Sequence, residues 1–116
     1  MPRLPEPSRA RYHHEMRAAK TATTDAARWT HLEHAHILSQ PDPWLHTENH
    51  LAMFSLAVRQ RDRREALGQV VRIIAAAPAS LAGRYPEGNT GRARVGLRQP
   101  MPTPPELTAL LHPAAA

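Results

Sequence analysis

The chain of 116 residues contains no cysteine, and this absence excludes several kinds of function. Disulfide bonds, thiolate zinc sites and cysteine nucleophiles cannot occur. Any metal ion that the chain binds must therefore be held by nitrogen and oxygen atoms. The eight histidines and ten acidic residues are the side chains that could supply those atoms.

Long hydrophobic runs are also absent. No apolar segment approaches the roughly 20 residues that a membrane-spanning helix needs. The first residues, Met1 to Pro5, lack the apolar centre of a secretory signal. We therefore expect a cytoplasmic protein that has no membrane partner.

Aromatic residues make up only 4% of the chain, so alanine, leucine and valine must supply most of the core packing. The length suits one small domain with a single core. Almost all of the 15 basic residues are arginine, and the formal net charge is +5. These arginines are scattered along the chain and do not line one helix with aromatic residues between them. Nucleic acid is therefore not a favoured partner.

Capping residues and prolines predict an all-α fold with a four-helix domain over residues 8–77. The predicted helices run from Ser8 to Ala22, from Thr24 or Asp25 to Ser39, from Pro43 to Gln60 after an Asp42 cap, and from Asp62 to Ala77 before Pro78. Because the connecting turns are short, we expect two antiparallel hairpins, arranged as a small bundle or as in tetratricopeptide-type (TPR-like) repeats.

The remaining segments differ in composition from the helices. Residues 1–7 are rich in proline and predict a disordered lead-in. Residues 78–111 predict a loop rich in glycine, proline and arginine that packs on the helices and ends in a short helix, from about Thr103 to Leu111. Residues 112–116 predict a disordered tail.

Five polar side chains fall on the apolar faces of the predicted helices, where they must find partners because an unpaired buried polar group is costly. They are Glu15, Glu33, His36, His46 and His50. Counting residues from the turns that connect the helices, we expect the second and third helices to hold His36 level with His46, and Glu33 level with His50. On the first helix, Glu15 lies at about the same depth as Glu33 does on the second.

Imidazole and carboxylate ligands together suit zinc, iron, copper or nickel, and a His-x-x-x-His pair places two nitrogens one helical turn apart. Only one Glu-x-x-His motif is present, so a mononuclear or incomplete dinuclear site fits better than a full di-iron site. Nearby Met53 is interpreted as packing. The predicted inward row of the fourth helix, which offers no ligand, is Ala66, Leu67, Val70, Ile73, Ile74 and Ala77.

A hydrogen-bonded network explains the same burial without a metal, with Glu15 and Glu33 accepting hydrogen bonds from the three histidines.

Enzyme activity is not favoured, because no nucleophile motif and no substrate pocket can be identified. His13, His31 and His34 are expected to be solvated. The segment Gly88-Asn89-Thr90-Gly91 favours a tight turn over an anion-binding loop.

Four stretches carry a resemblance to a known family: Leu32-Glu33-x-Ala35-His36-Ile37-Leu38-x-Gln40-Pro41, His46-x-x-x-His50-x-x-Met53, Gly88-Asn89-Thr90-Gly91 with Val95, and Pro100-Met101-Pro102. They resemble domain-of-unknown-function family 3703, a group of small, mostly bacterial proteins. The resemblance covers most of the chain and implies no established activity. The two hairpins, each closing on a proline, also resemble tetratricopeptide-type repeats, although the characteristic first-helix pattern is missing.

The sequence thus supports two hypotheses. The first is a small helical protein that binds one transition-metal ion through His36, His46 and His50 with Glu33 or Glu15, for metal buffering, sensing or tolerance. The second is a TPR-like module that binds a protein partner and uses the same residues as a structural network. The metal, the partner and the oligomeric state remain open at this stage.

Overall fold

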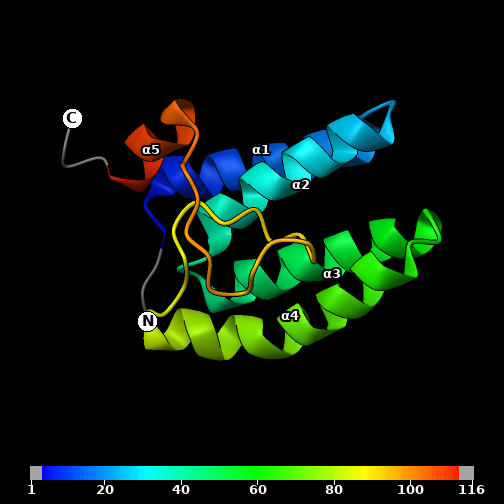
Figure 1. Ribbon diagram of the computed structural model, residues 1–116. Coiled ribbons are helices and arrows are strands. Elements are labelled where there is room, and N and C mark those ends of the chain that lie inside the picture. Colours follow the sequence, from blue (N-terminus) through cyan, green and yellow to red (C-terminus); the bar gives the residue numbers. More distant parts are fainter. Residues whose placement is uncertain (1–3, 113–116) are drawn as a thin grey trace.

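The computed structural model describes residues 4–112, and all regular secondary structure in that range is helical (Figure 1). The helices are α1 (Glu6–Thr21), α2 (Asp25–Ser39), α3 (Pro43–Arg59), α4 (Arg63–Ala82) and α5 (Pro105–Leu111). The predicted all-α fold with four long helices and one short one is confirmed. Within the described range, none of these helices combines the length and the apolar composition needed to cross a bilayer.

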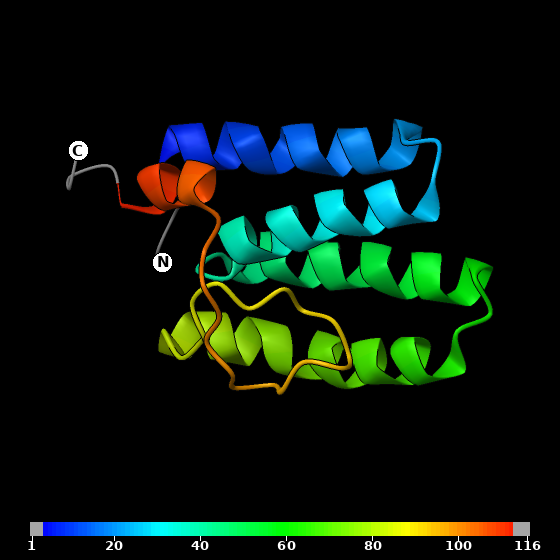
Figure 2. The same cartoon turned by 45° about the horizontal axis from the view of Figure 1, so that its top comes forward.

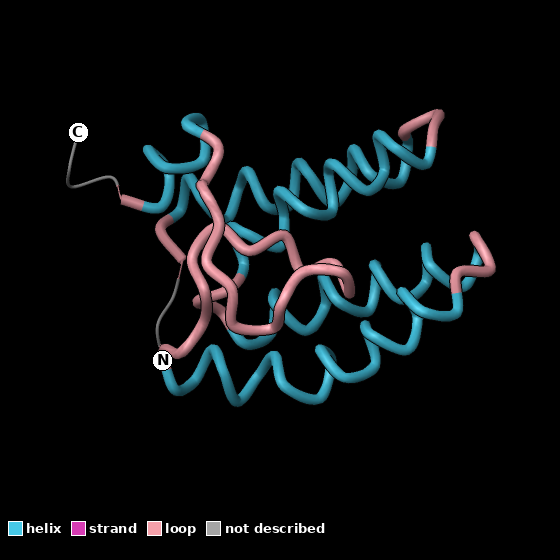
Figure 3. The backbone as a smooth tube through the Cα atoms, viewed as in Figure 1, coloured by secondary structure: helices cyan, strands magenta, loops and turns pink. Residues whose placement is uncertain are grey.

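The four long helices pack side by side in chain order and alternate in direction (Figure 2). Helices α1 and α2 form one hairpin, α3 and α4 form the other, and α2 packs against α3 between them. Helix α5 lies against α1 and α2. Residues 83–104, here called the covering loop, cross one face of the α3–α4 hairpin before they reach α5 (Figures 2 and 3).

Three helix starts follow from side chains that accept hydrogen bonds from free backbone N–H groups. The Thr24 hydroxyl accepts from the N–H of Ala27 at the start of α2. The Asp42 carboxylate accepts from Trp44 and Leu45 at α3, and the Asp62 carboxylate accepts from the third residue of α4. These caps were predicted and are confirmed.

The start of α1 differs from the prediction. Glu6 and Pro7, expected in a disordered lead-in, form its first turn, and Leu4 is buried in the core. Ser8 is not a cap, because its buried hydroxyl donates to the backbone oxygen of Leu110 and ties α1 to the end of α5. The remaining parts of the expected disordered ends, residues 1–3 and 113–116, lie outside the described residues.

The prediction that α4 ends before Pro78 is wrong, because the helix continues to Ala82. Pro78 is exposed, whereas Ser80 beyond it is buried and donates a hydrogen bond to the backbone oxygen of Gln40. This tertiary contact offsets the helical hydrogen bond that proline cannot make. Gly83, with φ of +67°, ends the helix in the left-handed region that favours glycine.

Helix α4 also faces the core with a different side than predicted. Leu67 and Ile74, expected inside, are 68% and 73% exposed. The buried row is mostly polar and consists of Glu65, Gln69, Arg72, Ala76 and Ser80. The reason is that this row contacts buried imidazoles and the polar backbone of the covering loop, and such partners require hydrogen-bonding side chains.

Two apolar clusters hold the helices together. The first connects α1, α2, the start of α3 and α5, and contains Leu4, Tyr12, Ala35, Ile37, Leu38, Leu45 and Leu107. The second connects α1, α2 and α3, and contains Ala19, Trp29, Leu32, Met53, Leu56 and Ala57. Met53 is thus a packing residue, as expected. Neither cluster includes a buried residue of α4, whose buried face is mainly polar.

The course of α4 past its proline leads to the first prediction. Pro78→Ala should raise the free energy of unfolding by about 1–2 kcal/mol, since alanine restores a helical hydrogen bond at some cost in unfolded-state entropy. Urea unfolding of the two proteins measures the difference. A helix that ended at Ala77 would instead make the substitution neutral or destabilising.

Candidate metal centre

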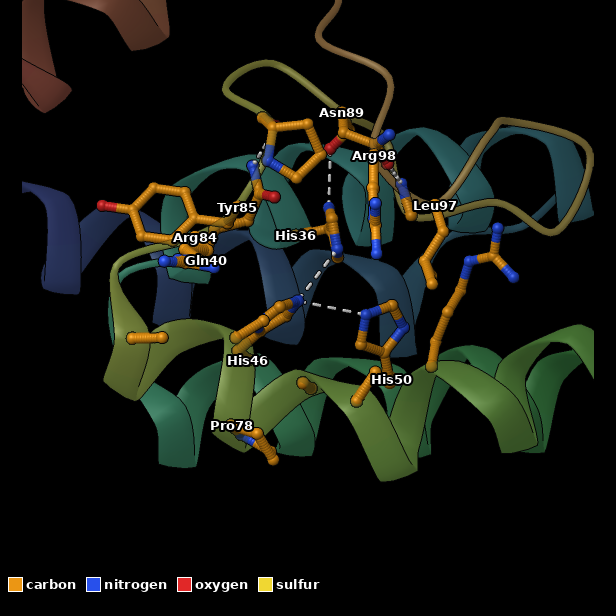
Figure 4. A pocket seen from close by; sticks show the side chains of 17 residues that line it. His36, Gln40, His46, His50, Pro78, Arg84, Tyr85, Asn89, Leu97 and Arg98 are labelled. Atoms are coloured by element: carbon orange, nitrogen blue, oxygen red, sulfur yellow. Dashed lines mark hydrogen bonds between the residues drawn. The ribbon is translucent and has the colours of Figure 1, made fainter.

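Three imidazole rings meet between α2, α3 and α4. His36 comes from α2, and His46 and His50 lie one turn apart on α3 (Figure 4). All three are buried, and the centroids of their rings are 4.7–5.0 Å apart. The Nε2 atom of His46 lies 3.2 Å from the Nε2 atoms of both His36 and His50. The three rings therefore turn the same nitrogen toward a common centre, and we call them the histidine triad.

The proton position on His36 follows from its partner in the covering loop. Its Nδ1 atom lies 2.6 Å from the backbone oxygen of Asn89. A carbonyl oxygen can only accept a hydrogen bond, so Nδ1 must carry the proton. A neutral ring then has a free lone pair on Nε2, which is the nitrogen that faces the other two histidines.

His50 is oriented in the same way by Gln69 of α4. The Nδ1 atom of His50 lies 2.7 Å from Oε1 of Gln69. The amide nitrogen of Gln69 donates to the carboxylate of Glu65 and to the backbone oxygen of Gly91, at 2.8 and 2.9 Å. Those two acceptors determine which end of the amide faces His50, and the oxygen must accept from Nδ1. His50 thus also has its free lone pair on Nε2.

His46 is oriented by Ser80, the buried serine beyond Pro78. Its Nδ1 atom lies 2.9 Å from the Ser80 hydroxyl oxygen. Since the hydroxyl proton is already donated to the backbone oxygen of Gln40, the oxygen must accept from Nδ1. All three histidines of the triad therefore carry their proton on the outer nitrogen and direct a lone pair at the shared centre.

Burial keeps this triad neutral. Desolvation, together with the neighbouring imidazoles, lowers the pKa of His36 well below its usual value. Burial is also the main cause that lowers the pKa of His46 to about 3 and the pKa of His50 to about 4. The lone pair of neutral His46 repels those of neutral His36 and His50 at 3.2 Å, and a cation between the three rings would remove that repulsion.

The spacing also matches a metal ion. A tetrahedral ion with metal–nitrogen bonds of about 2.0–2.1 Å separates its ligand nitrogens by about 3.3 Å. The two Nε2–Nε2 distances of 3.2 Å are close to this value. Among the acidic and histidine side chains of the described residues, these three histidines form the group that converges tightly enough to hold one ion.

The structure does not bring Glu33 to the triad. Its carboxylate lies 3.1 Å from Arg92 of the covering loop. Arg92 also pairs with Glu65 at 2.8 Å and stacks over the ring of Trp29, with 3.7 Å between guanidinium carbon and ring centroid. The side chain of Glu33 thus points to the covering loop.

Glu15 is buried, as predicted, but the residues that it pairs with do not belong to the triad. It pairs with Arg11 at 2.9 Å and with His31 at 2.6 Å, and His34 lies 3.5 Å away. Burial opposes ionisation, yet hydrogen bonds from His31 and Arg11 hold the pKa of Glu15 below its usual value. His31 and His34, expected to be solvated, therefore lie against a buried carboxylate, whereas His13 is exposed as expected.

The turn predicted at Gly88–Gly91 lies at Pro86–Asn89, where the N–H of Asn89 donates to the backbone oxygen of Pro86, and the residues that follow position His36. The Asn89 side chain donates to the backbone oxygens of Gly96 and Gln99 and accepts from the N–H of Gly91. Gly91 has φ of +84°, and a Cβ atom there would lie only 2.6–2.9 Å from ring atoms of His36. No local pattern indicated that Asn89 would orient His36, whereas the spacing of Glu65, Gln69, Arg72 and Ser80 along one helix face could have revealed the polar row of α4.

A cavity of about 660 Å³ adjoins the triad and reaches the surface between α4 and the covering loop (Figure 4). Arg84 and Arg98 at its edge are exposed. Gln40 also lines the cavity, and its side-chain oxygen is buried without a hydrogen-bond partner among the described residues. The triad is thus accessible to a small molecule, and an unused acceptor is present beside it.

The close approach of Gly91 to His36 gives the second prediction. Gly91→Ala should destabilise the protein by at least about 1 kcal/mol more than Gly83→Ala, because both residues have positive φ but only Gly91 touches a ring. Urea unfolding compares the two variants. Equal losses of stability would show that Gly91 does not press on His36.

Comparison with known proteins gives one result. The family model described as "Protein of unknown function (DUF3703)" matches residues 6–111, which include the triad, α4 and the covering loop. No curated protein and no solved structure matches significantly, so the TPR-like resemblance is not confirmed. Since the match covers most of the sequence, the chain belongs to the family of proteins of unknown function numbered 3703.

Proposed function

We propose that this protein binds one divalent transition-metal ion, with zinc as the first choice, through the Nε2 atoms of His36, His46 and His50. One observation carries the proposal: each Nδ1 proton is donated to an acceptor that is fixed by other contacts. Metal-binding histidines commonly have such a partner on the second nitrogen, which sets the tautomer and the direction of the ring.

A metal-free network explains the triad less well. That hypothesis needs carboxylates to accept from the histidines, but Glu15 and Glu33 pair with other residues. Without a metal, a proton shared at the centre would be the alternative way to relieve the repulsion between the Nε2 lone pairs. Burial and the positive charge of Arg72 both oppose a charged imidazole at His36 and His50.

Zinc suits the arrangement because the two Nε2–Nε2 distances from His46 match a tetrahedral ion, and three imidazole ligands leave one position free. Iron, copper and nickel also bind imidazole and are the competing ions. We infer that water takes the fourth position and donates a hydrogen bond to the unpaired oxygen of Gln40. The cavity provides the room for such a ligand.

A site with three protein ligands and an accessible fourth position suits reversible metal binding better than a permanent structural role, for which zinc usually has four protein ligands. We therefore infer a function in metal buffering or tolerance. The protein-interaction hypothesis rests on a different observation, the exposed apolar side chains of α3 and α4, and it is compatible with metal binding.

Metal titration of the protein without an affinity tag gives the third prediction. Zinc should bind with a stoichiometry of one and, at a hundredfold excess over Kd, stabilise the fold by about 2.7 kcal/mol. Cobalt should give the visible spectrum of a tetrahedral ion, and competition with iron(II), copper(II) and nickel(II) ranks the metals.

Two variants test the ligands. His46→Ala with His50→Ala should abolish binding, whereas His13→Ala with His14→Ala, two exposed residues of α1, should leave it unchanged. Circular dichroism checks that both variants fold, and His36→Asn serves as a milder ligand substitution. Absence of stoichiometric binding to the wild-type protein, or equal binding by the triad and control variants, would overturn the proposal.

A further inference from the structure

The outer side of the α3–α4 hairpin exposes many large apolar side chains to solvent. Of the nine large hydrophobic side chains that are exposed in the described part of the chain, eight belong to these two helices. Only Leu97 lies elsewhere, in the covering loop. The eight residues, here called the outer face, are Trp44, Leu51 and Val58 of α3 and Leu67, Val70, Val71, Ile74 and Leu81 of α4.

The outer face lies opposite the covering loop. At about 100° per residue, a residue two positions along a helix points to nearly the opposite side. Leu67 and Ile74 stand in this relation to Glu65 and Arg72, which contact the loop. On α3, Trp44, Leu51 and Val58 recur every seven residues and share the side turned away from the triad. The loop thus covers one side of the hairpin, which Figure 2 shows, and leaves the other uncovered.

The size of the outer face matches a stable interface. With side chains that are 40–77% exposed, it presents on the order of 700–800 Å² of apolar surface. Two such surfaces packed together would bury roughly 1,500 Å², which is the standard size of a specific protein–protein interface. Contiguous apolar patches on monomers are usually smaller, at about 300–600 Å².

We propose that the outer face is the interface of a symmetric dimer, in which two α3–α4 hairpins pack into a four-helix bundle. A twofold axis near Leu51 and Val71 lets the same surface serve both copies. Helices of this kind pack about 8–10 Å apart, so the two flat hairpin faces can meet along their whole length.

Charge selects the orientation of the two copies. The turn between α3 and α4 is lined by four exposed arginines, Arg59, Arg61, Arg63 and Arg64. A parallel arrangement would bring the two arginine clusters together, whereas an antiparallel one places each cluster beside Trp44 of the other copy. Arginine stacks favourably on tryptophan, as Arg92 does on Trp29 within the chain.

The dimer and the metal site are independent features, because they lie on opposite sides of the hairpin. Both cavities would face away from the interface and stay accessible in the dimer. The inference therefore does not depend on the proposed metal binding, and dimerisation should persist in the presence of a chelator.

The fourth prediction concerns the oligomeric state, which sedimentation velocity of the full chain measures at concentrations from about 1 to 200 µM. The wild-type protein should be a dimer. Ile74→Glu should weaken the dimer more than about tenfold, since the twofold axis would bury two unpaired charges. Leu67→Gln with Ile74→Gln should weaken it similarly, and Leu97→Gln, at the exposed apolar residue outside the face, should not. Both substituted α4 positions are exposed, so the monomer should still fold.

Two further readouts test the geometry. Emission of Trp44 should shift to shorter wavelength as the wild-type concentration rises, but not in the Ile74→Glu variant. Trp44→Ala should weaken the dimer, and Arg59→Ala with Arg63→Ala should do so as well if the arrangement is antiparallel. A wild-type chain that is monomeric at 200 µM, a dimer unaffected by Ile74→Glu, or a monomer that binds phospholipid vesicles through this face would overturn the inference.

Discussion

The site depends on three hydrogen bonds that hold protons on the outer nitrogens of His36, His46 and His50. Their acceptors come from different parts of the chain: a backbone oxygen in the covering loop and two side chains of α4. Each acceptor is fixed in turn by another contact, so the rings have little freedom to rotate or to change tautomer. The free lone pairs therefore converge whether or not an ion is present, and a ligand would meet a preorganised site.

This constraint explains the unusual character of α4. A helix that must supply Gln69, Arg72 and Ser80 to a buried polar region cannot place its apolar row on the same side. Its apolar residues consequently lie on the outer face, where the described chain offers nothing to cover them. The polar site on one side of the hairpin and the apolar surface on the other thus have a common origin in the sequence of a single helix.

Local signals in the sequence predicted most of the fold. Caps at Thr24, Asp42 and Asp62 act within a few residues, so the starts of α2, α3 and α4 could be read directly. Spacing within α3 and equal distance from the turn at Pro41 brought the three histidines together correctly. Depth along a helix, however, does not determine side-chain direction. The same reasoning therefore included Glu15 and Glu33 in the site but could not show that their carboxylates pair with arginines and a histidine elsewhere.

The continuation of α4 past Pro78 depends on a tertiary partner, the backbone oxygen of Gln40, which no local pattern reveals. Apolar residues were expected inside, but that rule does not hold when the neighbouring structure is polar.

Nitrogen NMR of isotope-labelled histidine tests the central claim most directly. In the metal-free protein near neutral pH, His36, His46 and His50 should all be neutral with the proton on Nδ1, and one equivalent of zinc should shift the three Nε2 resonances together. A proton on Nε2 of any of the three, or zinc shifts confined to the exposed histidines, would contradict the account.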